Sequence, residues 1–127
     1  MILRTDTIGH FDTPTEENIR AAISYPDENV RENDLVKLMI DDENFVCVWI
    51  GKREVGHRLE LRFGPTKVES HRRLDSEGAA DILIRYLHGD MSWFIELTWD
   101  QPVVVKLLEN LHILRMNQGS DPNQPME

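Results

Sequence analysis

Cysteine is almost absent from this sequence, and its scarcity excludes the disulfide framework that stabilises many small secreted domains. The one cysteine among the 127 residues, Cys47, cannot pair within the chain or hold a zinc ion by itself. Long apolar runs are also absent, because none approaches the roughly 18 residues of a membrane-spanning helix. The first residues lack the basic region and apolar stretch of a signal peptide. We therefore expect a soluble, cytoplasmic protein.

The short motifs that mark common catalytic sites are missing too. The sequence contains no glycine-rich phosphate loop, no dinucleotide-binding fingerprint, no H-E-x-x-H and no C-x-x-C. Its five histidines lie in different expected elements, and no two of them have a metal-binding spacing. Cys47 lies in an apolar stretch, where burial disfavours the reactive thiolate. We therefore predict no catalytic residue, no cofactor and no metal, and we expect that the protein is not an enzyme.

Basic residues are few relative to acids. The chain has 14 Lys and Arg against 23 Asp and Glu, which gives a net charge of -9. This charge disfavours non-specific attraction to nucleic acid or anionic lipid, so we predict neither a nucleic acid nor a membrane as partner. Seven of the basic residues lie between Lys52 and Arg73, which leaves the rest of the chain strongly acidic. An acidic body of this kind attracts a basic partner, at a rate that falls as salt rises.

Two helices are indicated by their caps and apolar stripes, and a third by its stripe alone. The first begins with Thr13 as N-cap, Pro14 at the first helical position and Glu16 closing a capping box, and it ends near Ser24. The second begins at Asp75 or Ser76, carries an apolar stripe and ends at a left-handed Gly89. Residues 103–114 fit a third helix, although their β-branched start also suits a strand.

Alternating apolar residues predict the strands. We expect an edge strand at 2–8, and a central strand at 45–50 because that stretch is apolar on both faces. Further strands are expected at 35–40, at 57–63, after a turn centred on Pro65 and Thr66, and at 93–99. That turn pairs Phe63 with Val68, Arg62 with Glu69 and Glu60 with His71.

Length and composition fit one domain, with 40% hydrophobic and 29% charged residues. We predict a single α+β domain over residues 1–116, followed by a disordered tail at 117–127. Its antiparallel sheet has about five or six strands, with two or three helices packed mainly on one face.

A proline-led helix at 13–23, a hairpin at 41–44, a second hairpin and a leucine-containing helix ending in Gly89-Asp90 precede Trp93 and Trp99. This order of elements resembles the small immunity proteins encoded beside bacterial polymorphic toxins, such as those of Rhs and contact-dependent inhibition systems. The resemblance spans about residues 13–100. It implies a non-catalytic protein that binds the active site, or a neighbouring surface, of a cognate toxin domain.

The resemblance and the acidic charge together suggest where such a toxin is bound. Toxins that act on nucleic acid usually present a basic cleft, which an acidic surface complements. Trp93 follows the corner at Gly89-Asp90, where we expect its indole to reach the surface as an anchor. The protein itself is expected to be a monomer or a weak homodimer. The predicted partner-binding residues are Asp41, Asp42, Glu43, Asp90 and Trp93.

Two other classes of function stay open. One is a small-molecule-binding or enzymatic domain with a pocket lined by Arg58, Arg62 and His71, in which the histidine would titrate abnormally. The other is an oligomeric adaptor subunit that associates through an exposed sheet edge. Sedimentation at several concentrations separates the adaptor, because an obligate assembly does not dissociate to a monomer.

Overall fold

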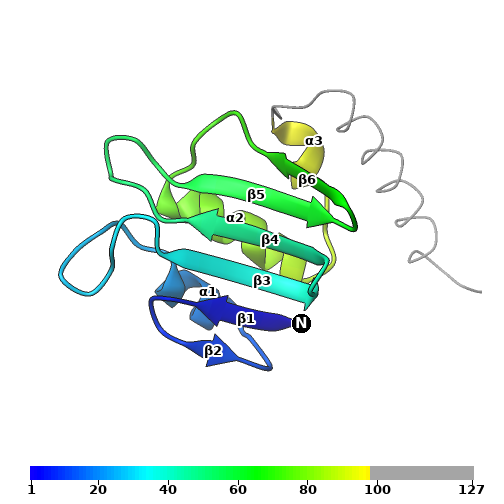
Figure 1. The fold of residues 1–127 in the computed structure, drawn as a ribbon, viewed down its shortest axis with the longest axis horizontal. Coiled ribbons are helices and arrows are strands. Elements are labelled where there is room, and N and C mark those ends of the chain that lie inside the picture. The colour runs from blue at the N-terminus through cyan, green and yellow to red at the C-terminus, as the bar shows by residue number, and fades with distance from the viewer. Residues whose placement is uncertain (98–127) are drawn as a thin grey trace, which may run out of the picture.

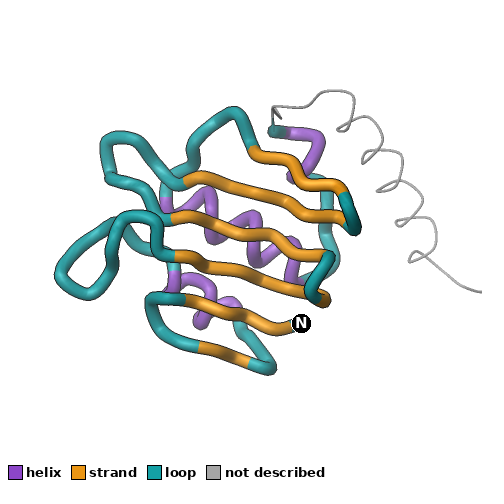
Figure 2. Tube along the Cα trace, viewed as in Figure 1, coloured by secondary structure: helices purple, strands orange, loops and turns teal. Residues whose placement is uncertain are grey.

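A computed structural model describes residues 1–97 of the chain, which form one layer of sheet and one layer of helices (Figures 1 and 2). All six strands belong to a single antiparallel sheet with the order β2-β1-β3-β4-β5-β6. The strands are β1 (Ile2–Thr5), β2 (His10–Phe11), β3 (Leu35–Asp41), β4 (Asn44–Trp49), β5 (Arg58–Phe63) and β6 (Thr66–Glu69). The helices are α1 (Glu16–Ala22), α2 (Ser76–Leu87) and α3 (Trp93–Glu96).

The core lies between the sheet and the helices, which pack on one of its faces (Figure 1). Period-two alternation turns one set of strand residues toward α1 and α2, and these side chains are fully or almost fully buried. The predicted fold class is therefore confirmed. No helix within residues 1–97 is long and apolar enough to cross a membrane. The main strand residues of this core are Leu3, Val36, Leu38, Val46, Val48, Leu59, Leu61 and Val68.

The strands predicted at 35–40 and 45–50 are confirmed as β3 and β4, the two middle strands of the sheet. The expected edge strand, in contrast, is not at an edge. Residues 2–5 pair with β3 on one side and with β2 on the other. The chain reverses through a turn in which Gly9 takes a φ of 99°, and Thr5 donates to the Gly9 carbonyl from both its N–H and its hydroxyl. This turn adds β2 as the true edge.

Helix α1 starts two residues later than predicted, at the second of two threonines. Thr15, not Thr13, is the N-cap, and its hydroxyl accepts from the N–H of Asn18 at 3.1 Å. The Asn18 side chain accepts in return from the N–H of Thr15 at 2.9 Å, so Asn18 completes the capping box that Glu16 was expected to close. Pro14 consequently precedes the cap rather than occupying the first helical position. Both threonines suit an N-cap, and the reciprocal amide decides between them.

The turn of the β5–β6 hairpin lies one residue earlier than expected, which shifts the predicted register. Gly64 and Pro65 are the two central residues, and Gly64 has a φ of 59°. A positive φ at the first position followed by proline fits a type II′ turn, which matches the twist of a hairpin. The result places like charges opposite each other, and a diagonal ion pair offsets this by joining Lys67 Nζ to Glu60 Oε1 at 2.6 Å. The observed pairs are Phe63 with Thr66, Arg62 with Lys67, Leu61 with Val68 and Glu60 with Glu69.

Helix α2 begins as expected, with the Asp75 carboxylate accepting from the N–H of Gly78 at 2.7 Å. It ends at Gly89, whose φ of 78° allows the N–H groups of Gly89 and Asp90 to bond back to the last turn.

The strand predicted at 93–99 is wrong where the structure describes it, because Trp93–Glu96 form the short helix α3. Trp93 and Phe94 are consecutive and both buried, which a strand on one face of a core cannot achieve. Residues 98 and 99, the helix expected at 103–114 and the tail at 117–127 lie outside the described residues.

Candidate functional site

The turn between β3 and β4 presents three consecutive acidic residues. Asp41 Oδ1 accepts from the backbone N–H of Glu43 at 2.8 Å and from the side-chain amide of Asn44 at 2.9 Å. These hydrogen bonds stabilise the carboxylate and lower the pKa of Asp41 below its ordinary value. Asp42 and Glu43 are exposed at the tip of the turn. Asp41 therefore holds the shape of the turn, while its two neighbours face solvent.

The turn lies at the same end of the sheet as the C-terminal end of α2 (Figure 1). Asp90 follows that helix and is exposed, and its carboxylate accepts from the N–H of Ser92 at 2.9 Å. The fold thus brings four of the five predicted partner-binding residues to one end of the molecule. We call Asp41, Asp42, Glu43 and Asp90 the acidic rim.

The fifth predicted residue, Trp93, does not reach the surface. Its side chain is 1% exposed, because the short helix α3 turns it into the core rather than outward. The indole N–H donates to the Asp90 carbonyl at 2.9 Å, and the ring contacts Tyr86 and Phe94 edge-on. The expectation of an exposed anchor at Trp93 is therefore wrong, and its contribution to the rim is to support the corner that carries Asp90.

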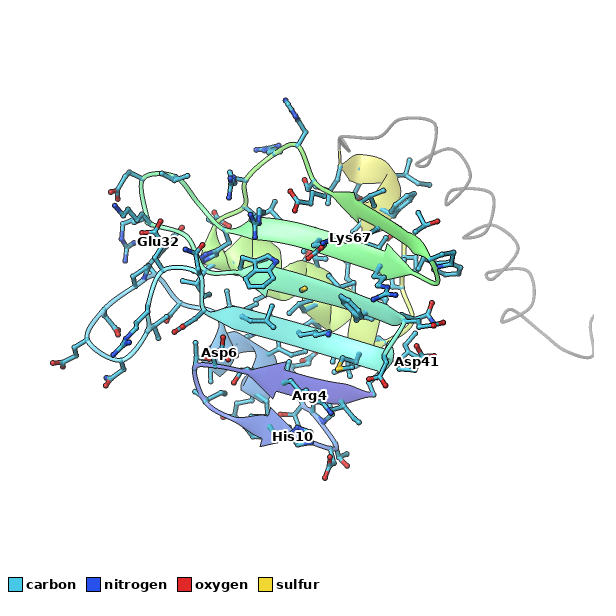
Figure 3. The ribbon with its side chains drawn as sticks, viewed as in Figure 1. Arg4, Asp6, His10, Glu32, Asp41 and Lys67 are labelled. Carbon is cyan, nitrogen blue, oxygen red and sulfur yellow. The ribbon has the colours of Figure 1, made fainter. Side chains whose placement is uncertain are left out.

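The face of the sheet away from the helices forms a second surface, which the sequence analysis did not identify. Figure 3 looks onto this face, which carries Arg4 on β1 and Lys67 on β6, with the helices behind the sheet. No helix of the described part covers it. We call it the open face and define it by the outward residues of five strands: Ile2, Arg4, Leu35, Lys37, Met39, Phe45, Cys47, Trp49, Arg58, Glu60, Arg62, Lys67 and Glu69.

Cationic side chains lie over the aromatic rings of the open face. Lys37 Nζ is 3.9 Å from the centroid of the Phe45 ring, and the Arg62 guanidinium approaches the same ring at 5.9 Å. Arg58 lies 5.2 Å from the Trp49 ring. Such contacts are electrostatically favourable, and the aliphatic stems of the cations exclude water from the rings. Phe45 is accordingly only 8% exposed, although no described helix lies over it.

A buried carboxylate, Glu60, lies at the centre of the open face and is 4% exposed. Besides its ion pair with Lys67, it accepts from the Trp49 indole N–H at 3.2 Å, and the Cys47 thiol lies 3.6 Å from it. Burial raises the pKa of the Cys47 thiol to about 11, despite the opposing effect of nearby cations such as Lys37. The thiol is therefore protonated at neutral pH, as the sequence suggested, and is not a nucleophile.

His57 and Ser76 are residue types that act together as a base and a nucleophile in many hydrolases. Here the hydrogen bond runs the wrong way for that role, because the imidazole donates to the serine hydroxyl. His57 is fully buried, and its Nδ1 accepts from the N–H of Gly51 at 3.0 Å. The ring proton must then be on Nε2, which donates to the Ser76 hydroxyl at 2.8 Å. A histidine in this tautomer cannot remove the serine proton, so the pair joins the start of α2 to the sheet and does not activate Ser76.

This arrangement predicts an acid-sensitive contribution to stability. Burial lowers the pKa of His57 below its ordinary value, because desolvation disfavours the charged ring and outweighs the opposing effect of the Asp75 carboxylate. Protonation of Nδ1 would also break the hydrogen bond from the Gly51 N–H. The neutral form is then favoured by folding, so its contribution is complete above about pH 6.5 and is lost as the pH falls further. We expect the free energy of unfolding to fall by at most about 1.4 kcal/mol per pH unit in that range.

Urea denaturation of the wild type and a His57→Asn variant at several pH values measures this effect. Asparagine can still accept from Gly51 but does not titrate, so the variant is expected to lack the His57 contribution. The other titrating groups are common to both proteins. The difference between the two free energies of unfolding at each pH therefore isolates the contribution of His57. Equal pH slopes in the two proteins between about pH 7 and pH 5 would contradict this role.

The cavity that Arg58 lines in the described part of the structure differs from the pocket predicted from Arg58, Arg62 and His71. Arg58 lines a cavity of about 170 Å³ whose other walls do not include Arg62 or His71. His71 is exposed in the loop between β6 and α2. Within residues 1–97, no group of three or more His, Cys, Asp or Glu side chains converges as metal ligands would. No protein-family model matches the chain, and neither a curated protein nor a solved structure matches it.

Proposed function

We propose that the chain is a non-catalytic immunity protein that binds and neutralises a cognate bacterial toxin domain. The observation that carries this proposal is the acidic rim, in which four exposed carboxylates from two elements lie at one end of the sheet. The net charge of -9 adds a long-range attraction for a basic partner. The order of elements that resembles immunity proteins gives this partner its identity as a toxin.

The chemistry of the rim suits the cleft of a nuclease-type toxin. Such a cleft gathers Lys and Arg to hold phosphates, and carboxylates can pair with the same groups. Asp41 is ionised over a wide pH range because its pKa is lowered, and its hydrogen bonds keep the turn in one shape. A preformed turn loses little conformational freedom on binding, which favours affinity. A rim of this kind neutralises a toxin by covering its catalytic cations.

The first test is co-expression with the C-terminal domain of the polypeptide encoded immediately upstream. Cell survival and co-purification as a stoichiometric complex are the expected results. An upstream domain that is toxic alone, yet is neither bound nor neutralised by this protein, would remove the proposal. So would an upstream domain without toxicity.

Charge reversal at the rim tests the site itself. In the Asp42→Lys and Glu43→Lys double variant, Asp41 still holds the turn, and neither altered side chain has a described hydrogen bond to lose. We expect toxin affinity to fall by about tenfold to a hundredfold and the association rate to lose much of its salt dependence. Surface plasmon resonance at several salt concentrations measures both quantities.

A Glu28→Lys and Glu54→Lys variant is the matched control. It makes the same change in net charge through two exposed loop residues at the opposite end of the sheet (Figure 1). If the two variants lose affinity equally, the effect comes from net charge and the rim is not the contact. Unchanged affinity in the rim variant would have the same meaning.

A further inference from the structure

The open face carries a charge opposite to that of the whole molecule. Arg4, Lys37, Arg58 and Arg62 form no ion pair within the described residues, although the protein has nine more acids than bases. Its buried carboxylate, Glu60, is already engaged by Lys67. In an acidic protein, cations that find no internal carboxylate are available to one brought by a partner.

A cavity opens where the Trp49 end of this face meets the loops that carry Glu32, Lys52 and Arg73. Its volume of about 170 Å³ accommodates one acidic side chain. Arg58 forms part of its wall, and the Nε of that guanidinium is buried without a hydrogen-bond partner. A buried donor without an acceptor is rare in folded proteins, and the other donors of the same guanidinium suit a carboxylate placed in the cavity. Glu32 neutralises only Lys52, at 3.8 Å.

We propose that the open face is a second protein-docking surface, separate from the acidic rim, whose partner inserts a carboxylate beside Arg58 and packs an apolar side chain against Trp49. The guanidinium of Arg58 suits a carboxylate because its fork of donors can bind both oxygens. Lys37 and Arg62 lie over the Phe45 ring on the same face, where they can pair with further acids of the partner. Trp and Arg together are the residue types most enriched among residues that dominate binding energy.

A protein partner fits these observations better than a nucleic acid. Stacking of bases needs exposed ring faces, whereas the Phe45 ring is 8% exposed and is covered by Lys37 and Arg62. A polyanion is also repelled by the net charge of -9, while a protein with a local acidic patch need not be. The proposal stands independently of the toxin hypothesis, since it uses no residue of the acidic rim.

Nuclear magnetic resonance of the ¹⁵N-labelled full chain tests the proposal with two probes. The first is a short synthetic peptide in which glutamates flank a phenylalanine, and the second is an oligothymidylate of the same charge. We expect the peptide to give saturable shifts in β3, β4 and β5 and a downfield shift of the Arg58 Nε–H signal. The oligothymidylate is expected to give weaker shifts at the same concentrations.

Two charge-reversal variants then locate the contact. The Arg58→Glu and Arg62→Glu double variant is expected to weaken peptide binding by at least about tenfold. The Arg20→Glu and Arg31→Glu variant changes net charge equally at exposed positions off the open face, and it is expected to bind nearly as well as the wild type. An Arg58→Lys variant keeps the charge but not the fork, and an intermediate affinity is expected.

The titration of the wild-type protein decides the matter even if a variant folds poorly. Absence of saturable shifts on the open face at millimolar peptide would overturn the proposal. Tighter binding of the oligothymidylate to that face would identify a nucleic-acid surface instead. Equal loss of peptide binding in both double variants would reduce the effect to net charge and also overturn it.

Discussion

Replacing Gly51 by alanine is expected to destabilise the protein by about 3 kcal/mol or more, the largest loss that we anticipate from one added methyl group. A Cβ at this position would lie 1.9 Å from the Gly56 carbonyl oxygen and 2.9 Å from its carbon. The backbone cannot move away easily, because the N–H of Gly51 donates to buried His57. In the substituted protein, either the new methyl group clashes with Gly56, or the backbone shifts and the buried His57 Nδ1 loses its donor.

Urea denaturation measures this loss, and Gly89→Ala is the matched glycine control. Gly89 has a φ of 78°, and no atom of residues 1–97 lies within 4 Å of an added Cβ, so alanine there is expected to incur the left-handed backbone strain of about 1 to 2 kcal/mol. The difference between the two variants reports the close backbone contact. A Gly51→Ala protein as stable as Gly89→Ala would show that the loop from 51 to 56 rearranges freely.

Replacing Trp93 by alanine is expected to cost about 3 to 5 kcal/mol of stability. The indole is buried in the core, where it contacts Tyr86 of α2 with ring centroids 6.5 Å apart and Phe94 at 6.3 Å. Alanine would leave a large cavity and also remove the donor to the Asp90 carbonyl. The corner that carries Asp90 would lose one of its hydrogen bonds. Thermal and urea denaturation measure the loss.

A Trp93→Phe variant separates this structural role from a role as a toxin anchor. Phenylalanine keeps most of the buried area, so the expected loss is smaller, and toxin affinity is expected to stay close to that of the wild type. A large loss of affinity in a well-folded Trp93→Phe protein would mean that the indole does touch the partner. A loss of less than about 1 kcal/mol in Trp93→Ala would contradict its burial.

The main elements of the fold follow from local patterns. Period-two alternation over 35–40 and 57–63 locates β3 and β5 because one face of each strand meets the core, and the Asp75 cap with Gly89 bounds α2 for stated chemical reasons. The register of the β5–β6 hairpin is less predictable. Moving the turn by one residue changes every pair of opposing residues in the hairpin. Pairing of opposite charges favoured the predicted register, but in the structure Lys67 reaches Glu60 diagonally.

The acidic rim could be predicted in part because Asp41, Asp42 and Glu43 are consecutive. The open face could not, because its cations come from four strands and become neighbours only when the sheet forms. The apolar stretch 45–50 predicts a strand that is buried on both faces, and residues 45–48 are indeed buried. Lys37 and Arg62 provide the cover over Phe45 on the side away from the described helices.

The open face also bears on how copies of this protein meet. In a two-fold symmetric dimer, the same patch lies on both sides of the interface, so Arg58 and Arg62 of one copy would approach the same cations of the other. A closed dimer through this face is therefore self-repelling. The acidic rim of one copy could approach the open face of the next, but that contact joins different patches and does not close on itself. Repulsion between molecules of charge -9 opposes such a chain of copies. The distribution of charge thus disfavours self-association of the protein through its open face.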